Sequence, residues 1–443
     1  MRGNALLILH EYHEKTGTVR DHLRAISDCE DLDVMKVDYT AAEYVDLTHF
    51  NVILLHYSII IASPHYVSMR LRDKIAAFRG LKILFIQDEY RWIDSTAEAI
   101  RDLGLHVVFS LCNPEIARKV YHHPWCQNIR FEPTLTGFVS EDLCRLPTPD
   151  YELRPIDVAY RARKLTSWMG SHTIQKWRIA DRFLEDARKY GLAVDISTRE
   201  EDRLYGEAWI DLMRNAKAVL GTESGASVCD FTGRIQQESE AYLERYPKTS
   251  FEELKRRFFP DADGKIVMNV ISPRCFEAAA LRTLMVMYEG EYAGILEAGR
   301  HYVELKRDHS NIDEVVSAIR SPEIAKRFIR SAYDEIAMSG RWTRRALTNH
   351  LSRVLTEEIG RHRVRGGTAA KAAATIAAAR AAGRRSPRAQ LASLGSAGVN
   401  LIDNWLPAPI RRGVRPFARA CFRVLKYLIA RSRQTLAGAP APK

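Results

Sequence analysis

Along the N-terminal part of the chain, short continuous apolar runs alternate with segments in which apolar residues recur at helical spacing. Helical spacing of apolar residues lies between these runs, for example over 66–78. Continuous apolar strands separated by helices are typical of a parallel sheet that is covered by helices on both faces. The pattern therefore predicts a doubly wound, Rossmann-like α/β domain over residues 1–145. The expected strands are 5–9, 32–38, 51–61, 82–92 and 106–111.

The pattern stops in a Pro-rich segment, LPTPDYELRP, and then begins again. We predict a linker over 146–155, a second Rossmann-like domain over 156–345 and a closing helix over 346–360. A polar insertion with helices is expected at about 233–258. Two tandem α/β domains enclose a cleft, and ligands bind beyond the carboxyl ends of the strands that face it. The expected strands of the second domain are 156–163, 192–197, 218–224, 284–290 and 301–306.

The charge is concentrated after residue 360. Residues 361–443 contain 17 Lys and Arg residues and a single acid, Asp403, whereas the preceding residues are slightly acidic. An Ala-rich stretch is followed by 410–433, where apolar residues recur at helical spacing among Arg and Lys. We predict a basic, partly helical tail whose amphipathic helix binds an anionic membrane surface. A nucleic-acid partner is not expected, because the tail has few aromatic residues and no known binding motif.

Targeting and cysteine patterns favour an intracellular protein. The apolar run near the N-terminus is too short for a signal peptide, and no run of eighteen apolar residues occurs. The seven cysteines are scattered and form no Cys-x-x-Cys pair, which argues against a cysteine-rich zinc site. The expected location is the cytoplasm, peripheral on the inner face of the membrane.

The stretch ISPRCFEAAALRTLMVMYEG, residues 271–290, combines a helix start with charged side chains. Ser272 is suited to cap a helix whose first residue is Pro273. Arg274 then lies at the positive end of that helix, which favours an anionic ligand. Glu277, one turn further, is a pure hydrogen-bond acceptor that suits a pair of sugar hydroxyls.

Two other strand ends carry polar residues and converge on the same edge of the predicted sheet. One follows the strand 156–163 and is basic, and the other is the segment GTESGAS, whose Gly225 permits a close backbone approach to a ligand. Together with the helix start, these residues predict a site for a nucleoside diphosphate. The residues of the two strand ends are Arg161, Arg163, Lys164, Glu223, Ser224 and Gly225.

The segment SPRCFEAAALRTLMVMYEGEYAGILEAGRHYVEL resembles the donor site of GT-B glycosyltransferases, in particular the group-1 and CgeB-like (spore-coat-type) enzymes. This resemblance implies that Glu277 holds the ribose of a nucleotide sugar and that Ser272 and Arg274 hold its diphosphate. It also implies that the basic residues after 156–163 neutralise the leaving phosphate, and that no metal or other cofactor is needed. The chain departs from the family pattern at Asn269, where many members have a second Glu, and at Arg282, where they have Gly.

The first domain is expected to bind the acceptor and to supply a general base. The candidates at its strand ends are His10, Asp88 and Glu89. The leading hypothesis is transfer of a sugar from a nucleoside-diphosphate sugar to a glycan, a lipid-linked or another cell-surface acceptor. Two alternatives remain: a nucleotide-sugar epimerase of the same fold, and a catalytically silent binding scaffold, which the missing second Glu favours.

Overall fold

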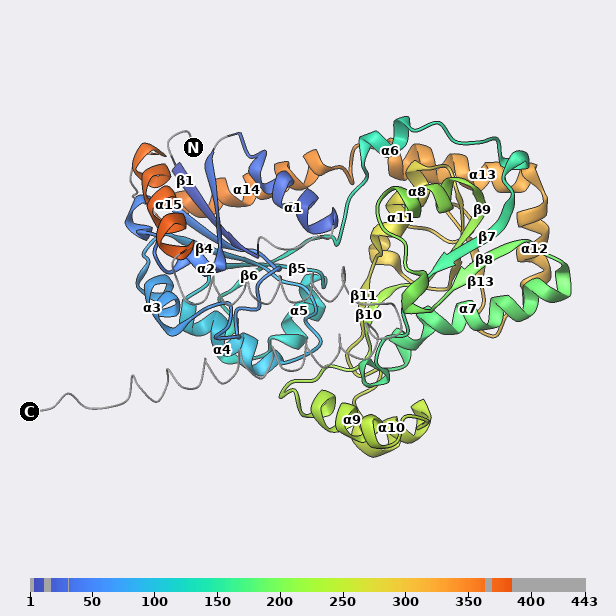
Figure 1. Cartoon of the computed structure of the whole chain (residues 1–443), viewed down its shortest axis with the longest axis horizontal. Coiled ribbons are helices and arrows are strands. Elements are labelled where there is room, and N and C mark those ends of the chain that lie inside the picture. Colours follow the sequence, from blue (N-terminus) through green and yellow to red (C-terminus); the bar gives the residue numbers. More distant parts are fainter. Residues whose placement is uncertain (1–3, 12–16, 31, 363–368, 385–443) are drawn as a thin grey trace, which may run out of the picture.

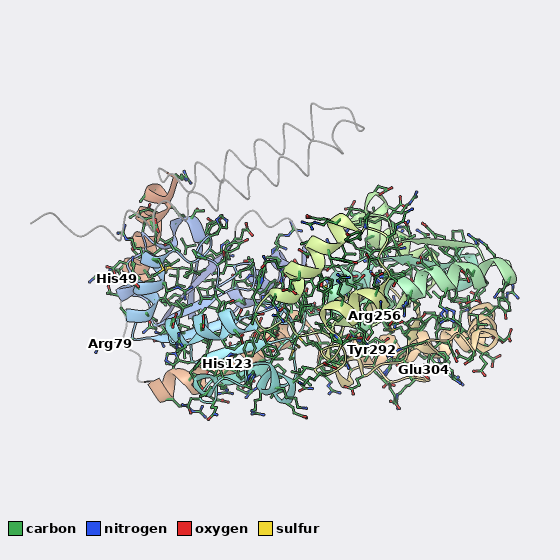
Figure 2. All side chains as sticks on the ribbon, turned by 90° about the horizontal axis from the view of Figure 1, so that it is seen from below. His49, Arg79, His123, Arg256, Tyr292 and Glu304 are labelled. Atoms are coloured by element: carbon green, nitrogen blue, oxygen red, sulfur yellow. The ribbon has the colours of Figure 1, made fainter. Side chains whose placement is uncertain are left out.

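The computed structural model describes residues 4–11, 17–30, 32–362 and 369–384. These residues form two α/β domains that lie side by side (Figure 1). Side chains fill the space between the ribbons of both domains (Figure 2). The predicted fold class, two doubly wound α/β domains in tandem, is confirmed. The predicted membrane-binding helix over 410–433 lies outside the described residues, as does most of the basic tail.

The N-terminal domain contains a six-stranded parallel sheet in the order β2-β1-β3-β4-β5-β6. Its central strands are apolar at almost every position and fully buried, because helices cover both faces. The predicted strands are present, although the run 51–61 is a strand only at its start. β6 was not predicted, since its sequence RFEP has no apolar run. The strands are β1 (Asn4–His10), β2 (Leu32–Asp38), β3 (Val52–Leu55), β4 (Leu81–Phe85), β5 (Val107–Ser110) and β6 (Arg130–Pro133).

Local signals fix where the helices of this domain begin and end. Ser68 and Asn113 cap α3 and α5 through their side chains, and α4 ends at Gly104 in the left-handed conformation. α3, α4 and α5 pack on one face of the sheet and α1 packs on the other. The helices are α1 (Gly17–Ser27), α2 (Tyr39–Ala42), α3 (Met69–Ala77), α4 (Ile93–Leu103) and α5 (Pro114–Val120).

The C-terminal domain contains a five-stranded parallel sheet in the order β13-β12-β9-β7-β8. α8 and α11 cover one face, and α7, α12 and α13 cover the other. The strands are β7 (Ile156–Arg161), β8 (Val194–Ser197), β9 (Ala216–Gly221), β12 (Leu284–Tyr288) and β13 (Val303–Leu305). The helices are α7 (Ser171–Tyr190), α8 (Glu207–Arg214), α11 (Pro273–Ala280), α12 (Ile312–Arg320) and α13 (Pro322–Ala332).

An insertion between β9 and α11 reaches toward the N-terminal domain. It contains the antiparallel pair β10 (Ser224–Ala226) and β11 (Met268–Val270), and the helical hairpin of α9 (Arg234–Arg245) and α10 (Phe251–Phe258). β10 and β11 lie between the two domains (Figure 1). Met268 and Cys229 belong to the same apolar cluster as the N-terminal sheet, so the insertion forms part of the contact between the domains.

The chain crosses between the domains twice. The outward crossing includes α6 (Glu141–Arg145), and the return leads into α14 (Arg344–His362). The two crossings lie side by side, because the amide of Val139 donates a hydrogen bond of 2.7 Å to the carbonyl of Trp342. α14 then packs Leu351, Val354 and Leu355 against the N-terminal sheet.

The Ala-rich segment differs from the prediction of a single tail over 361–443. Residues 369–384 form α15 (Ala369–Arg384), which packs on the N-terminal domain beside α2 and β2 (Figure 1). Ala372, Ile376 and Ala379 are buried in its core. Small side chains permit this close packing: a Cβ added at Gly383 would lie 2.7 Å from the Cβ of Ala41. The low-complexity sequence is therefore a packed helix in this stretch.

In the part of the chain that the structure describes, no helix has the length and apolar character needed to cross a bilayer.

Candidate active site

The site lies where the order of the C-terminal sheet reverses. From β7 the chain moves to β8 on one side and to β9, β12 and β13 on the other. In doubly wound sheets the carboxyl ends of the two strands at such a point open a crevice in which ligands bind. Here that point lies between β7 and β9. Of the polar residues predicted from the sequence, Arg163 and Lys164 follow β7, and Glu223 and Ser224 follow β9.

The predicted start of α11 is confirmed. The Ser272 hydroxyl accepts a hydrogen bond of 3.4 Å from the amide of Arg274, and Pro273 occupies the first helical position. The amides of the first helical turn have no partner within the helix, and Pro, which lacks an amide hydrogen, leaves none unpaired at this position.

Arg274 is held between two aromatic rings. Its guanidinium carbon lies 4.8 Å from the ring centroid of Tyr160 and 5.0 Å from that of Trp209. One of its terminal nitrogens donates a hydrogen bond of 2.6 Å to the carbonyl of Arg161. Its Nε is buried and has no hydrogen-bond partner within the described residues. The guanidinium group is therefore fixed in place while one of its donors remains unused.

Glu277 shares the same aromatic partner. Its Oε2 accepts a hydrogen bond of 2.8 Å from the indole nitrogen of Trp209. Burial raises the pKa of Glu277, while the indole hydrogen bond and the charge of Arg274 act in the opposite direction. Trp209 lies on α8 and was not predicted as a site residue, because nothing in the sequence of that helix distinguishes it from a core aromatic.

Lys176 on α7 completes the cluster and was also missed by the sequence prediction. Its side chain is partly buried, and its ammonium group makes no ion pair or hydrogen bond among the residues that the structure describes. Burial, together with the charges of Arg274 and Arg163, lowers the pKa of Lys176 to about 8, whereas Asp88 raises it. The charges of two other cations, and of one acid from the other domain, thus act on Lys176. Like charges held together are unfavourable unless an anion joins them.

Of the three basic residues predicted to bind phosphate, only Arg163 belongs to this cluster. Arg161 is bound within its own domain: its guanidinium group lies 2.8 Å from the carboxylate of Asp195 and also donates to the carbonyl of Asp202. Lys164 lies 3.3 Å from the carboxylate of Asp181, on the exposed side of α7. Arg161 and Lys164 thus have acidic partners within their own domain, and their role in phosphate binding stays a prediction.

Glu223 stabilises a loop within the domain. Its Oε1 accepts hydrogen bonds of 2.8 Å and 3.1 Å from the amides of Tyr292 and Glu291, and the side chain is buried. Burial raises the pKa of Glu223 even though these hydrogen bonds oppose the shift. The carboxylate therefore fixes the loop after β12 and borders a pocket at the same time.

Ser224 and Gly225 belong to β10, opposite Val270 and Asn269 of β11. Gly225 has φ of 106°, and a Cβ added there would lie only 1.8 Å from the carbonyl oxygen of Met268. The glycine is thus required by the packing of β10 on β11. The predicted reason, close approach of the backbone to a ligand, stays a prediction beside this one.

A polar pocket of about 510 Å³ opens beside these strands, at the start of α7. His172 is anchored there, because its Nε2 donates a hydrogen bond of 3.1 Å to the carbonyl of Ser224. The main polar residues around the pocket are Ser171, His172, Gln175, Glu223, Asn269, Glu289, Glu291 and Arg307.

The three candidate bases of the N-terminal domain lie in different environments. Asp88 is exposed, has a left-handed φ of 56° and pairs with Arg91 at 3.6 Å. Glu89 is buried, its carboxylate accepts hydrogen bonds from Ser110, and burial raises its pKa to about 7. His10 is also buried, and burial lowers its pKa. Of these three, Asp88 alone combines exposure with proximity to Lys176.

Arg282, at a position where the family that the segment resembles has Gly, adopts a backbone conformation that favours glycine. Its φ is 52°, in the left-handed region, and its guanidinium carbon lies 3.8 Å from the ring centroid of Tyr333. The ring contact offsets part of the backbone strain, and the side chain points toward the segment after α13. This departure from the family pattern therefore leaves the residues of the cationic cluster unaltered.

No protein-family model matches the chain, and no curated protein matches it. Among solved structures it is similar to a DNA-modifying β-glucosyltransferase, with 13% identity and a TM-score of 0.47 over 79% of this chain and 98% of that one. It is also similar to Anabaena Alr3699/HepE in complex with UDP, with 11% identity and a TM-score of 0.47 over 81% and 100% of the two chains. An α-glucosyltransferase in complex with UDP gives 9% identity and a TM-score of 0.44 over 75% and 95%.

Proposed function

We propose that the protein is a glycosyltransferase that moves a sugar from a nucleoside-diphosphate sugar to an acceptor bound between the domains. The observation that carries this proposal is the guanidinium group of Arg274, which is held between Tyr160 and Trp209 and whose buried Nε has no partner in the described residues. With Arg163 and Lys176 it forms a group of three cations at the carboxyl ends of the C-terminal sheet. A diphosphate would neutralise the positive charge of these three side chains. The backbone amides at the start of α11 would donate further hydrogen bonds to it.

Glu277 supports a nucleotide as the rest of the ligand. Its carboxylate lies one turn from Arg274 and already accepts a hydrogen bond from the Trp209 indole. A ribose offers two neighbouring hydroxyl donors, which match the acceptor capacity of an ionised carboxylate. The anion and the sugar of a nucleotide are thus met by neighbouring side chains.

The chemistry follows from this arrangement. The hydroxyl oxygen of the acceptor forms a bond to the anomeric carbon of the donor sugar, and the bond from that carbon to the phosphate oxygen breaks. The electron pair of the broken bond stays on the diphosphate, where Lys176, Arg163 and Arg274 stabilise the added charge. We propose that these cations serve in place of a metal ion. Asp88, on the opposite domain, is the proposed acceptor of the hydroxyl proton.

The chemical class of the acceptor is proposed from the sequence. The sequence favours a glycan, a lipid-linked or another cell-surface acceptor, assembled next to an anionic membrane that the basic tail binds. An epimerase would alter the nucleotide sugar without any acceptor, and a scaffold would bind it without turnover. Product analysis with and without acceptor separates the three possibilities.

The cationic cluster is tested by measuring nucleotide-sugar binding to Lys176→Gln. A panel of UDP-, GDP-, ADP-, CDP- and dTDP-sugars is first tested for thermal stabilisation of the unaltered protein. For the sugar that binds, calorimetry should show about a tenfold or greater loss of affinity in Lys176→Gln, because a charge-assisted hydrogen bond to phosphate contributes roughly 1.5–3 kcal/mol.

Lys189→Gln is the matched control, since Lys189 lies on the same helix but is exposed near its end. Its affinity should equal that of the unaltered protein. Equal affinities for both variants would contradict the assignment of the diphosphate to this cluster.

A further inference from the structure

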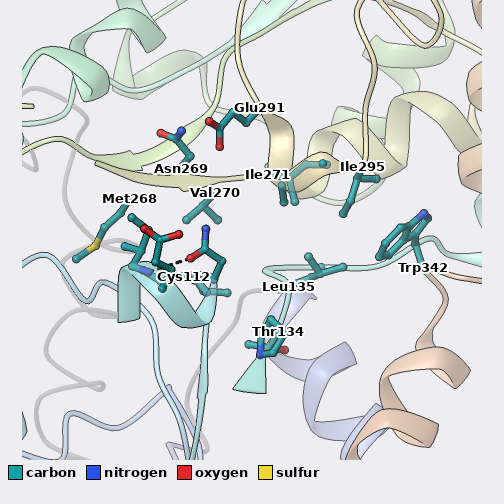
Figure 3. Close-up of a pocket in the computed structure, with 18 of the residues that line it drawn as sticks. Cys112, Thr134, Leu135, Met268, Asn269, Val270, Ile271, Glu291, Ile295 and Trp342 are labelled. Atoms are coloured by element: carbon teal, nitrogen blue, oxygen red, sulfur yellow. Dashed lines mark hydrogen bonds between the residues drawn. The ribbon is translucent and has the colours of Figure 1, made fainter. Parts of the chain in front are cut away.

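A second and larger cavity, of about 960 Å³, lies between the two domains. It is bordered by loops after β5 and β6 of the N-terminal domain, by β11, and by the start of α14. Figure 3 shows Leu135, Ile271, Ile295 and Trp342 gathered around this space. The volume is at the upper end of the range of small-molecule sites, roughly 300–1,000 Å³.

The wall of this cavity is mainly apolar. Ile116, Leu135, Phe138, Val267, Trp342 and Leu347 line it and are only partly buried. Large apolar side chains that face one common space mark a binding surface more often than ordinary exterior. Polar residues such as Asn113, Thr134 and Arg341 also line the cavity. Against its apolar part, however, the hydroxyls of an oligosaccharide would lack partners, at a cost of about 1–3 kcal/mol for each buried group. The wall therefore fits an apolar occupant.

The cavity lies next to the polar pocket of the C-terminal domain, and the two share lining residues. Asn269 and Glu291 border both spaces. Figure 3 shows Met268 and Val270 on one side of β11 and Asn269 on the other side, toward Glu291. The amide oxygen of Asn269 is buried and has no hydrogen-bond partner in the described part of the chain. A hydroxyl donor of a ligand at this junction would satisfy it.

We propose that the acceptor is an amphipathic molecule in which an aliphatic chain carries a hydroxylated head group. The chain occupies the apolar cavity, and the head group reaches Asn269 and Glu291 where the cavity meets the polar pocket. This inference rests on the proposed function, and it narrows the acceptor from glycans in general to a lipid-linked molecule. It also gives Asn269 a role as a positioning residue for the acceptor hydroxyl.

The test compares two ligands that share a head group. Binding of n-octyl β-D-glucoside, below its micelle concentration, and of methyl β-D-glucoside is measured by calorimetry on the full chain. The octyl compound should bind saturably, and the methyl compound should bind at least tenfold more weakly. Equal affinity for both compounds, or no binding of either, would overturn the proposal.

Substitutions test whether octyl glucoside binds in this cavity. Leu135→Asp places a charge in the apolar wall and should weaken octyl glucoside binding at least tenfold. Leu153→Asp is the control, because Leu153 is an exposed leucine outside the cavity, and it should bind as the unaltered protein does. Asn269→Ala, which removes the amide but not the wall, should lower the affinity for octyl glucoside severalfold while thermal stability is kept. Unchanged binding in Leu135→Asp would overturn the proposal.

Nucleotide-sugar binding is measured on the same samples, so that a failure of the proposed acceptor can be distinguished from a failure of the proposed function. Stabilisation by a nucleotide sugar without octyl glucoside binding overturns the acceptor proposal alone. Octyl glucoside binding without any nucleotide-sugar binding overturns the proposed function, and the acceptor role of the cavity with it. A nucleotide sugar that still stabilises Leu135→Asp shows that this variant is folded.

Discussion

At the scale of single residues, Lys176 makes donor binding depend on pH. In the ligand-free protein its pKa is lowered to about 8, mainly by burial and then by Arg274. An anionic ligand beside it raises that pKa, so binding takes up a proton above pH 8. We expect the affinity for the nucleotide sugar to be constant below about pH 7 and to fall above pH 8, by up to about tenfold per pH unit.

Calorimetry of the unaltered protein between pH 6.5 and 9.5 measures this profile. Lys176→Arg keeps a positive charge throughout this range, so its affinity should remain flat above pH 8. A parallel decline in both proteins would assign the pH dependence to another group.

Glu277 gives a second prediction at this scale. Glu277→Ala should remain folded, because the carboxylate has a single hydrogen bond, to Trp209, within the described residues. Its affinity for the nucleotide sugar should fall by about 1–3 kcal/mol, the cost of leaving buried hydroxyl partners unmatched. Binding of inorganic diphosphate, which has no ribose, should change much less. Equal losses for both ligands would contradict a ribose role for Glu277.

At the scale of elements, the pair β10–β11 sets the geometry of the site. Gly225→Ala should destabilise the protein by at least about 2 kcal/mol, since it combines an unfavourable φ with a clash against the Met268 carbonyl. Gly191→Ala is the matched control: Gly191 also has positive φ, 62°, but a Cβ there meets nothing within 4 Å. It should cost only about 1 kcal/mol. Similar melting temperatures for both variants would show that β10 and β11 separate easily.

These short strands also show what a sequence can and cannot predict. Helix starts such as Ser272-Pro273 depend on neighbouring residues, so local chemistry predicts them correctly. The strands β10 and β11 are three residues long and exist only through their mutual pairing, and the sequence gives no periodic signal for them. Arg161 illustrates the same limit, because its partner Asp195 lies on a neighbouring strand and not nearby in sequence.

At the scale of the whole molecule, the architecture was predictable and the composition of the site was not. Buried parallel strands consist of continuous apolar runs, and these runs predicted both domains correctly. The cationic cluster combines Arg163, Lys176 and Arg274 from three separate elements with Asp88 from the other domain. Lys176 lies in a helix with no motif around it. Only the folded arrangement shows that its ammonium group has no ion pair among the described residues and lies where Arg274, Arg163 and Asp88 affect its charge.

The whole-molecule view also decides where the C-terminal tail should be cut. A chain ending at residue 384 keeps α15, whereas one ending at 362 loses it and exposes the surface of α2 and β2 that Ala372 and Ile376 cover. We expect the first truncation to melt at the temperature of the full chain and to bind the nucleotide sugar equally well. The second should be less stable by several kcal/mol, because it removes the buried side chains of Ala372, Ile376 and Ala379 and exposes the apolar surface that they cover.

The truncation at residue 384 also tests the membrane prediction. Residues 385–443 hold most of the basic residues of the tail and the predicted amphipathic stretch 410–433. Each basic residue near an anionic surface contributes roughly 1 kcal/mol, so the full chain should sediment with phosphatidylserine-containing vesicles at moderate salt, and the chain ending at 384 should not. Equal sedimentation of both would show that membrane binding, where it occurs, belongs to the two folded domains, and the basic tail would then need another anionic partner.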